Sequence, residues 1–157
     1  MRISRVTLSL VALSVAGLGL TVAAQQKPAA AAAPKVTVYK TSSCGCCRLW
    51  VDYMKQNGFD VQAMDVSSAD VRAVSKAAGL RDEDASCHTA KIGNYVVEGH
   101  VPADDIKRML KEKPAIAGLS APGMPQGSPG MEQGSKEPYD VVAFTKDGKT
   151  TVFAKHK

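Results

Sequence analysis

A tight cluster of cysteines constrains this chain more than any other feature of its sequence. Cys44-Gly45-Cys46-Cys47 stands directly after a run with alternating β-branched residues and directly before an apolar helical pattern. A helical turn that begins at this junction brings the sulfurs of Cys44 and Cys47 together, because they are three residues apart. The free N–H groups and the dipole of a helix start lower the pKa of thiols. The junction therefore favours thiolate chemistry and requires a strand that leads straight into a helix.

The pattern on both sides of this junction predicts an α/β domain. Period-two alternation indicates strands, and helical spacing of apolar residues, with Gly58 and Gly79 at the ends, indicates helices. Gly93-Asn94 predicts a hairpin turn, and Pro102 is typical of a helix start. The predicted elements are strand 35–40, helix 46–57, strand 59–66, helix 69–78, strands 90–92 and 95–98, and helix 103–111. This β-α-β-α-β-β-α order is that of a thioredoxin-like domain, here residues 35–113.

Residues 114–157 form a predicted extension of that domain. From Pro114 to Pro138 glycine and proline are too dense for helix or sheet. A loop of this length without its own secondary structure is uncommon in a compact domain unless it is functional or disordered. Residues 139–144 and 150–154, around Asp147-Gly148, then predict a second β-hairpin.

The first 34 residues predict export. Arg2 and Arg5 precede an uncharged run, Val6 to Val22, and small residues end at Ala24, so residues 1–24 are typical of a cleaved signal peptide. An uncleaved anchor helix is the alternative, since the run reaches the short limit of a bilayer span. Residues 25–34 are an Ala/Pro-rich linker. We expect a periplasmic protein that is not attached to the membrane after the signal peptide is removed.

The charge of the chain excludes a nucleic-acid-binding function. The formal net charge is +5, from 20 Lys and Arg against 15 Asp and Glu. Removal of Arg2 and Arg5 leaves 18 − 15 = +3, and no block of Lys and Arg concentrates it.

The cysteines allow three interpretations. Cys44 and Cys47 are the candidate catalytic residues of a redox dithiol, and the whole cluster is a candidate metal-thiolate site. A structural disulfide is the third possibility, because exported proteins oxidise unprotected thiols. Cys46 separates the first two: a dithiol enzyme needs only Cys44 and Cys47, whereas a third thiol suits a soft metal.

Cys87 and His88 add a fourth sulfur and an imidazole. In a thioredoxin-like order this segment enters the third strand beside the start of the first helix, so we expect it to meet the cysteine cluster. His88 is either a metal ligand or a residue that supports the ligands. His100 is interpreted as a turn residue ahead of a helix, and His156 as a tail residue.

Two methionines in the Gly/Pro loop narrow the choice of metal. Met124 and Met131 lie in GMPQGSPGM, where no helix or strand face can bury them. They are either soft ligands or hydrophobic anchors of the loop. Thiolates with thioethers favour Cu(I), whereas thiolates with one histidine equally suit Zn(II).

The sequence also resembles a known family. VTVYKTSSCGCCRLWVDYMKQNGFDV, SCHTAKIGNYVVEGHVPADDIKRML and GLSAPGMPQGSPGMEQ are similar to the CopG-type family of bacterial periplasmic copper-resistance proteins. The match runs from about Lys35 to the C-terminus. The C-x-C-C motif with Ser-Cys-His-Thr and Gly-Met-Pro-x-Gly-Ser-Pro-Gly-Met is far more specific than a lone C-x-x-C.

The resemblance implies a thioredoxin-like domain whose C-terminal extension helps to bind metal. It implies that Cys44, Cys46, Cys47 and Cys87 hold a multinuclear, thiolate-bridged Cu(I) cluster, and that the protein interconverts Cu(I) and Cu(II) in copper detoxification. The Met124 and Met131 loop falls in the matching extension. Unlike ordinary thioredoxins, the chain has no proline at Thr89 or Ala90, which disfavours disulfide exchange with protein substrates.

We therefore predict a periplasmic copper-binding protein of copper resistance, possessing a copper oxidoreductase activity if it cycles the metal. The candidate metal ligands are the four cysteines, with His88, Met124 and Met131. Expected partners are copper ions and periplasmic copper efflux or chaperone proteins. A thiol-disulfide oxidoreductase that uses Cys44 and Cys47, and a structural zinc-thiolate module, are the alternatives.

Overall fold

The computed structural model describes residues 32–157. The predicted signal peptide, residues 1–24, and most of the linker lie outside the described residues. Strands and helices alternate as far as β3. The elements are β1 (Lys35–Lys40), α1 (Gly45–Gln56), β2 (Asp60–Asp65), α2 (Ser68–Ala77), a 3-10 turn (Asp82–Asp84), β3 (His88–Ile92), β4 (Tyr95–Glu98), α3 (Ala103–Glu112), β5 (Gly118–Ser120), β6 (Tyr139–Phe144) and β7 (Thr150–His156). The α/β, thioredoxin-like prediction is confirmed, including the C-terminal hairpin β6–β7.

All seven described strands form one sheet, in the order β2-β1-β3-β4-β5-β6-β7. β1 pairs with β2 in parallel and with β3 in antiparallel register. β4 pairs in parallel with β5, which bonds to β6 on its other side. The extension thus continues the sheet of the preceding domain, and the boundary drawn between residues 35–113 and 114–157 stays a prediction.

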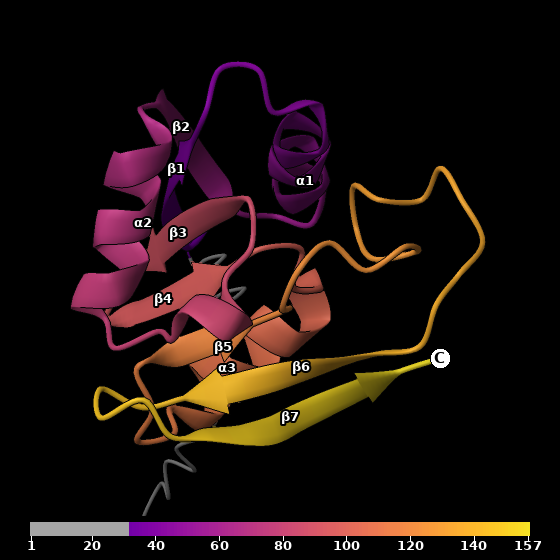
Figure 1. Cartoon of the computed structure of the whole chain (residues 1–157). Coiled ribbons are helices and arrows are strands. Elements are labelled where there is room, and N and C mark those ends of the chain that lie inside the picture. The colour runs from indigo at the N-terminus through magenta and orange to yellow at the C-terminus, as the bar shows by residue number, and fades with distance from the viewer. Residues whose placement is uncertain (1–31) are drawn as a thin grey trace, which may run out of the picture. The chain divides into compact units, whose positions relative to one another are not determined.

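The two faces of the sheet have different chemistry because successive side chains of a strand point to opposite sides. Val38 of β1 and Ala90 of β3 join Trp50 and Met54 of α1 and Ile106 of α3 in the main apolar core. The opposite face carries Thr89 and Glu98, which meet α2 through hydrogen bonds and an ion pair rather than through apolar contact alone. Figure 1 shows α1 and α2 on opposite sides of β1 and β3.

One sequence prediction about the fold is wrong. The segment 114–138 is not free of sheet structure, because Gly118–Ser120 forms the buried strand β5. Glycine is required there: a Cβ at Gly118 would collide with the carbonyl oxygen of Val96. The glycine that argued against a strand is therefore the residue that lets β5 fit between β4 and β6.

A feature of the fold brings distant segments to one end of β1 and β3. β1 ends at Lys40 and β3 begins at His88, and these two residues pair across the sheet. The start of α1 follows β1, and Cys87 precedes β3. Residues from both segments therefore converge without any long loop having to reach them.

No helix in residues 32–157 is long and apolar enough to cross a bilayer.

Candidate metal centre

Cys44 stands at the start of α1, the helix that carries most of the cysteine cluster. The sulfur of Cys44 accepts a hydrogen bond from the backbone N–H of Cys47 at 3.3 Å, and Cys44 itself is the N-cap. Hydroxyl side chains are the usual caps, and Thr41, Ser42 and Ser43 precede this helix, but none of them takes the role. Here the sulfur satisfies one of the free N–H groups of the helix start, so the first turn holds Cys44 and Cys47 at fixed positions.

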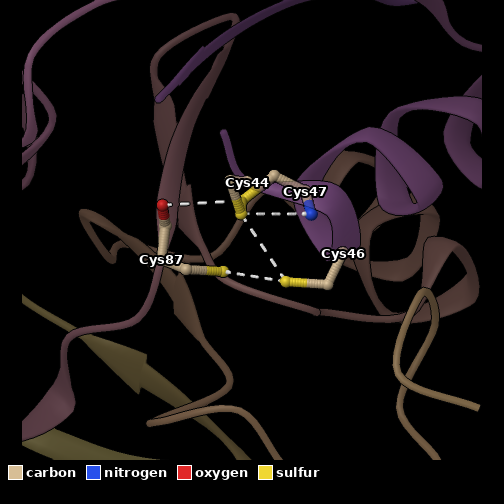
Figure 2. Close-up of side chains that lie close together, drawn as sticks. All are labelled: Cys44, Cys46, Cys47 and Cys87. Carbon is tan, nitrogen blue, oxygen red and sulfur yellow. Dashed lines mark hydrogen bonds between the residues drawn. A yellow bond between two sulfur atoms is a disulfide. The ribbon is translucent and has the colours of Figure 1, made fainter. Parts of the chain in front are cut away.

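The structure brings all four predicted cysteines together. Their sulfur atoms all lie within 4.8 Å of one another. The sulfur of Cys46 lies 3.6 Å from that of Cys44 and 4.0 Å from that of Cys87. Figure 2 shows the side chains of α1 and of the segment before β3 pointing toward a common centre. Four sulfurs at such separations could hold a soft metal ion.

The four thiols are not in the same state. Cys44 and Cys47 form a disulfide, whereas Cys46 and Cys87 are free. Cys47 is fully buried, and the other three side chains are partly exposed. The predicted dithiol and the predicted metal cluster therefore share the same atoms: the disulfide must open before all four sulfurs can bind a metal.

Cys87 is protonated when no metal is present. Burial, and then the neighbouring thiol of Cys46, raise the pKa of Cys87 to about 12. A metal that binds this sulfur has to displace its proton, because only the thiolate is a good ligand. Binding at the cluster is therefore expected to release protons.

His88 lies behind the cluster, fully buried. Its Nδ1 is 3.4 Å from the sulfur of Cys87, and its ring packs on that of Trp50 with centroids 4.5 Å apart. Its Nε2 has no hydrogen-bond partner among the described residues. Burial, and then the nearby His100, hold the pKa of His88 well below its usual range, so the ring is neutral and can act as a ligand or acceptor.

His100 is a site residue that the sequence interpretation missed. It lies in the bend between β4 and α3, as the sequence indicated, but it is fully buried, and its Nε2 lies 3.1 Å from the sulfur of Cys87. Cys87, His88 and His100 form a second group that could hold a metal ion. The hairpin register contained the signal, because Thr89 pairs with Glu98 and two further steps place His100 opposite Cys87. His156, the predicted tail residue, lies elsewhere and contacts Asp105 at 2.7 Å.

The methionines are placed less closely than the cysteines. Met124 is 54% exposed, and Met131 is half-buried. No hydrogen bond within residues 32–157 joins either thioether to a cysteine sulfur. The roles of Met124 and Met131 as ligands therefore stay predictions.

The loop that carries these methionines nevertheless packs on the site through its backbone. The carbonyl oxygen of Pro129 lies 2.8 Å from Nδ1 of His100. A Cβ at Gly130 would lie 2.9 Å from the carbonyl oxygen of Cys46 and 2.9 Å from the backbone nitrogen of Trp50. The hydroxyl of Ser86, the residue before Cys87, donates to the carbonyl oxygen of Gly123. Loop, helix start and strand start thus form one unit.

Comparison with known proteins agrees with this geometry. A family model described as "Protein of unknown function, DUF411" matches residues 84–131, which include Cys87, His100 and both loop methionines. A solved structure named "Copper resistance protein copG- Form 1" is 40% identical, with a TM-score of 0.72, covering 78% of this chain and 98% of its own. "Copper resistance protein copG- Form 2" has the same identity and TM-score and covers 80% and 99%. No curated protein matches the chain.

Proposed function

The chain belongs to the CopG copper-resistance protein family, and from that premise we propose that it binds copper through a cluster of cysteine thiolates and interconverts Cu(I) and Cu(II). One observation carries the proposal: four cysteine sulfurs lie within 4.8 Å of one another. Thiolates are soft ligands that favour Cu(I) over harder ions. In this proposal copper is both the metal that the protein binds and the metal whose oxidation state it changes.

The reduced pair of Cys44 and Cys47 supplies the electrons for the conversion. Closing the Cys44–Cys47 bond from two thiolates releases two electrons, which reduce two Cu(II) ions to two Cu(I) ions. Opening it consumes two electrons and restores two soft ligands. The structure holds this pair in its oxidised state, with Cys46 and Cys87 reduced beside it. This supports Cys44 and Cys47 as the redox-active pair and all four cysteines as ligands.

The two histidines behind Cys87 would support the ligands. His100 lies 3.1 Å and His88 3.4 Å from the sulfur of Cys87. Both are buried, and burial lowers the pKa of each ring, so they present neutral imidazoles to the cluster. The loop methionines would add thioether ligands if the side chain of the exposed Met124 turned inward.

The compartment proposed for this activity is the periplasm. The N-terminal pattern of residues 1–24 supports export. Mass spectrometry of the exported protein tests this, with Gln25 expected as the first residue. An intact residue 1–24 segment found in membranes would contradict it.

Metal analysis of the mature protein tests the proposed function. The protein is reduced, freed of reductant under anaerobic conditions, and offered Cu(I) and Zn(II) in equal amounts. We expect copper to be retained and zinc to be excluded, with more than one copper per chain. Retention of zinc, together with unfolding on chelation, would instead indicate the structural zinc module.

A thiol-disulfide oxidoreductase is the second candidate, because the Cys44–Cys47 disulfide sits at a helix start. That function requires neither Cys46 nor copper. An insulin-reduction assay with Cys46→Ser distinguishes the two: full reductase activity without copper binding would favour the oxidoreductase.

A further inference from the structure

A cavity of about 250 Å³ opens beside the cysteine cluster on the α2 side of the sheet. Its wall includes Cys44 and Cys87 from the cluster, and Ser68 and Arg72 from α2. Cys46 and Cys47 do not line it. At about 30 Å³ for each water molecule in the liquid, the cavity has room for a small organic molecule.

The cavity makes the two sulfurs of the disulfide unequal. Cys44 is partly exposed and lines the cavity, whereas Cys47 is fully buried. An external nucleophile can therefore reach only the sulfur of Cys44. The sulfur of Cys47 becomes the leaving group, and it lies 3.6 Å from the carbonyl oxygen of Cys87, within the cluster where a metal would bind. The difference in burial thus determines which sulfur is attacked, that of Cys44, and which one leaves, that of Cys47.

One charged side chain lines the cavity. The side chain of Arg72 is 26% exposed, and its guanidinium donates to the hydroxyl of Ser75 at 2.7 Å and pairs with Asp82. Glu98 lies 3.9 Å away, fully buried, and burial raises the pKa of its carboxyl. Asp82, in contrast, is 73% exposed, where its charge is screened by water. Asp82 is shared with Lys76, which lies 3.4 Å from it, so two cations surround this carboxylate. The charged group that lines the cavity itself, together with Cys44, is the guanidinium of Arg72.

We propose that this cavity binds a low-molecular-weight thiol that carries a carboxylate, and that this thiol reduces the Cys44–Cys47 disulfide. The carboxylate lies toward Arg72, and the thiolate attacks the sulfur of Cys44. The inference rests on the proposed function, because it names the source of the electrons that reduce the Cys44–Cys47 disulfide back to two thiolates.

The reaction balances in two steps. In the first, the small thiolate forms a mixed disulfide with Cys44, and the Cys44–Cys47 bond breaks to release the thiolate of Cys47. In the second, another small thiolate attacks the small-molecule sulfur of the mixed disulfide and releases the thiolate of Cys44. Two thiols are oxidised to one small-molecule disulfide, and the protein gains two electrons and two free ligands.

Three small thiols of similar size and different charge test the choice of ligand: 3-mercaptopropionate, 2-mercaptoethanol and cysteamine. The copper-free, oxidised protein is mixed with each under anaerobic conditions, and the gain of two alkylation sites is followed by mass spectrometry. Rates are divided by the thiolate concentration of each reagent. We expect the anionic thiol to react about fivefold faster than the cationic one, because unlike charges attract across the cavity. Arg72→Gln is expected to remove this preference, and Arg72→Lys to keep most of it.

Two matched variants test the cavity itself. Ser68 lines it, whereas the neighbouring Ala69, also exposed and in the same first turn of α2, does not. We expect Ser68→Tyr to slow reduction by all three thiols about tenfold, because the ring fills the space that the thiol needs. Ala69→Tyr is expected to react like the unmodified chain. Equal rates for the two variants would overturn the inference, and so would a charge preference that Arg72→Gln leaves intact.

The proposed function is checked separately in the same proteins. Each is reduced chemically, freed of reductant and loaded with Cu(I). Normal copper binding by the reduced Ser68→Tyr protein, alongside slow reduction by small thiols, supports both inferences. An unmodified protein that binds no copper would contradict the proposed function alone, whereas rates that ignore charge and cavity would contradict the thiol site alone.

Discussion

The cysteine cluster and the methionine loop both offer soft sulfur ligands, but the fold holds them in different ways. The cysteines stand on the first turn of α1 and directly before β3, and their side chains meet one another. The loop, by contrast, is held by its backbone: Pro129 contacts His100, and Gly130 packs on α1. Its methionine at position 124 is 54% exposed.

The difference teaches which parts of the site are preformed. Regular elements place the thiols before any metal arrives, so the cluster loses little conformational entropy on binding. The backbone of the loop is also fixed before metal binds, but the methionine side chains still have to lose rotamer freedom when they bind metal. Changes to the cysteines should therefore abolish binding, changes to the loop backbone should disturb both fold and binding, and changes to the methionine side chains should only adjust affinity.

The largest effect is expected from the cysteines themselves. Cys46→Ser should lower the amount of bound copper as much as Cys44→Ser does, because both sulfurs are ligands in the proposed copper cluster. Copper per chain is measured after anaerobic loading of the reduced proteins. Ser43→Ala, at an exposed neighbouring position, is the control and should bind copper normally. Full copper in Cys46→Ser would show that Cys46 is not a ligand.

Removing the imidazole that joins the two regions should have the next largest effect. His100→Ala leaves the carbonyl of Pro129 without its partner and opens a hole beside Cys87. We expect a loss of about 3 kcal/mol in the free energy of unfolding, measured by urea denaturation of the metal-free protein. His156→Ala removes a partly exposed ring from the buried Asp105, which keeps Arg108 at 3.8 Å, so we expect a loss of about 1 kcal/mol. Equal losses would mean that His100 does not fasten the loop.

The close approach of the loop to α1 can be tested with two glycines of similar conformation. Gly130 and Gly123 both have positive φ, of 87° and 69°, so alanine strains the backbone at each. Only Gly130 also meets backbone atoms, whereas a Cβ at Gly123 meets nothing within 4 Å. Each change should cost about 1 kcal/mol through strain, and Gly130→Ala about 1–2 kcal/mol more. Thermal unfolding of the two variants measures the difference in stability. Equal losses would show that the loop moves away from α1 at no cost.

The smallest effect on stability is expected from the methionine side chains. Met124→Ala with Met131→Ala should weaken Cu(I) retention or shift the copper potential while the four thiolates still assemble. Unfolding should change by less than about 0.5 kcal/mol for the exposed Met124. Competition with a Cu(I) chelator measures retention. Unchanged retention combined with a fall of several degrees in melting temperature would identify the methionines as hydrophobic anchors instead.

Much of the fold was predictable because local patterns and global topology agree. The alternation of β1, the apolar spacing of α1 and the turn at Gly93-Asn94 each indicated the observed element. The convergence of Cys87 with Cys44 followed from element order, since β3 pairs with β1. The short strand β5 could not be found in the same way, because three residues carry no period and their pairing depends on β4 and β6.

The site was predictable to the extent that it depends on thiols in regular elements. The helix cap was not, since sulfur is a weak acceptor and the preceding hydroxyls fit the usual cap pattern better. The burial of His100 depends on the loop at Pro129, which no local pattern places. Its position opposite Cys87, however, could have been read from the hairpin register.

Trp50 gives the molecule an optical property. It is the single tryptophan in the chain, fully buried, and its indole N–H donates to the carbonyl oxygen of Val101 at 3.0 Å. Its ring packs on His88, whose own neighbour is Cys87. Its fluorescence therefore arises from one defined environment next to the cysteines. Copper that binds to the thiolates should quench that emission, so copper binding and release can be followed by the fluorescence of the unlabelled protein.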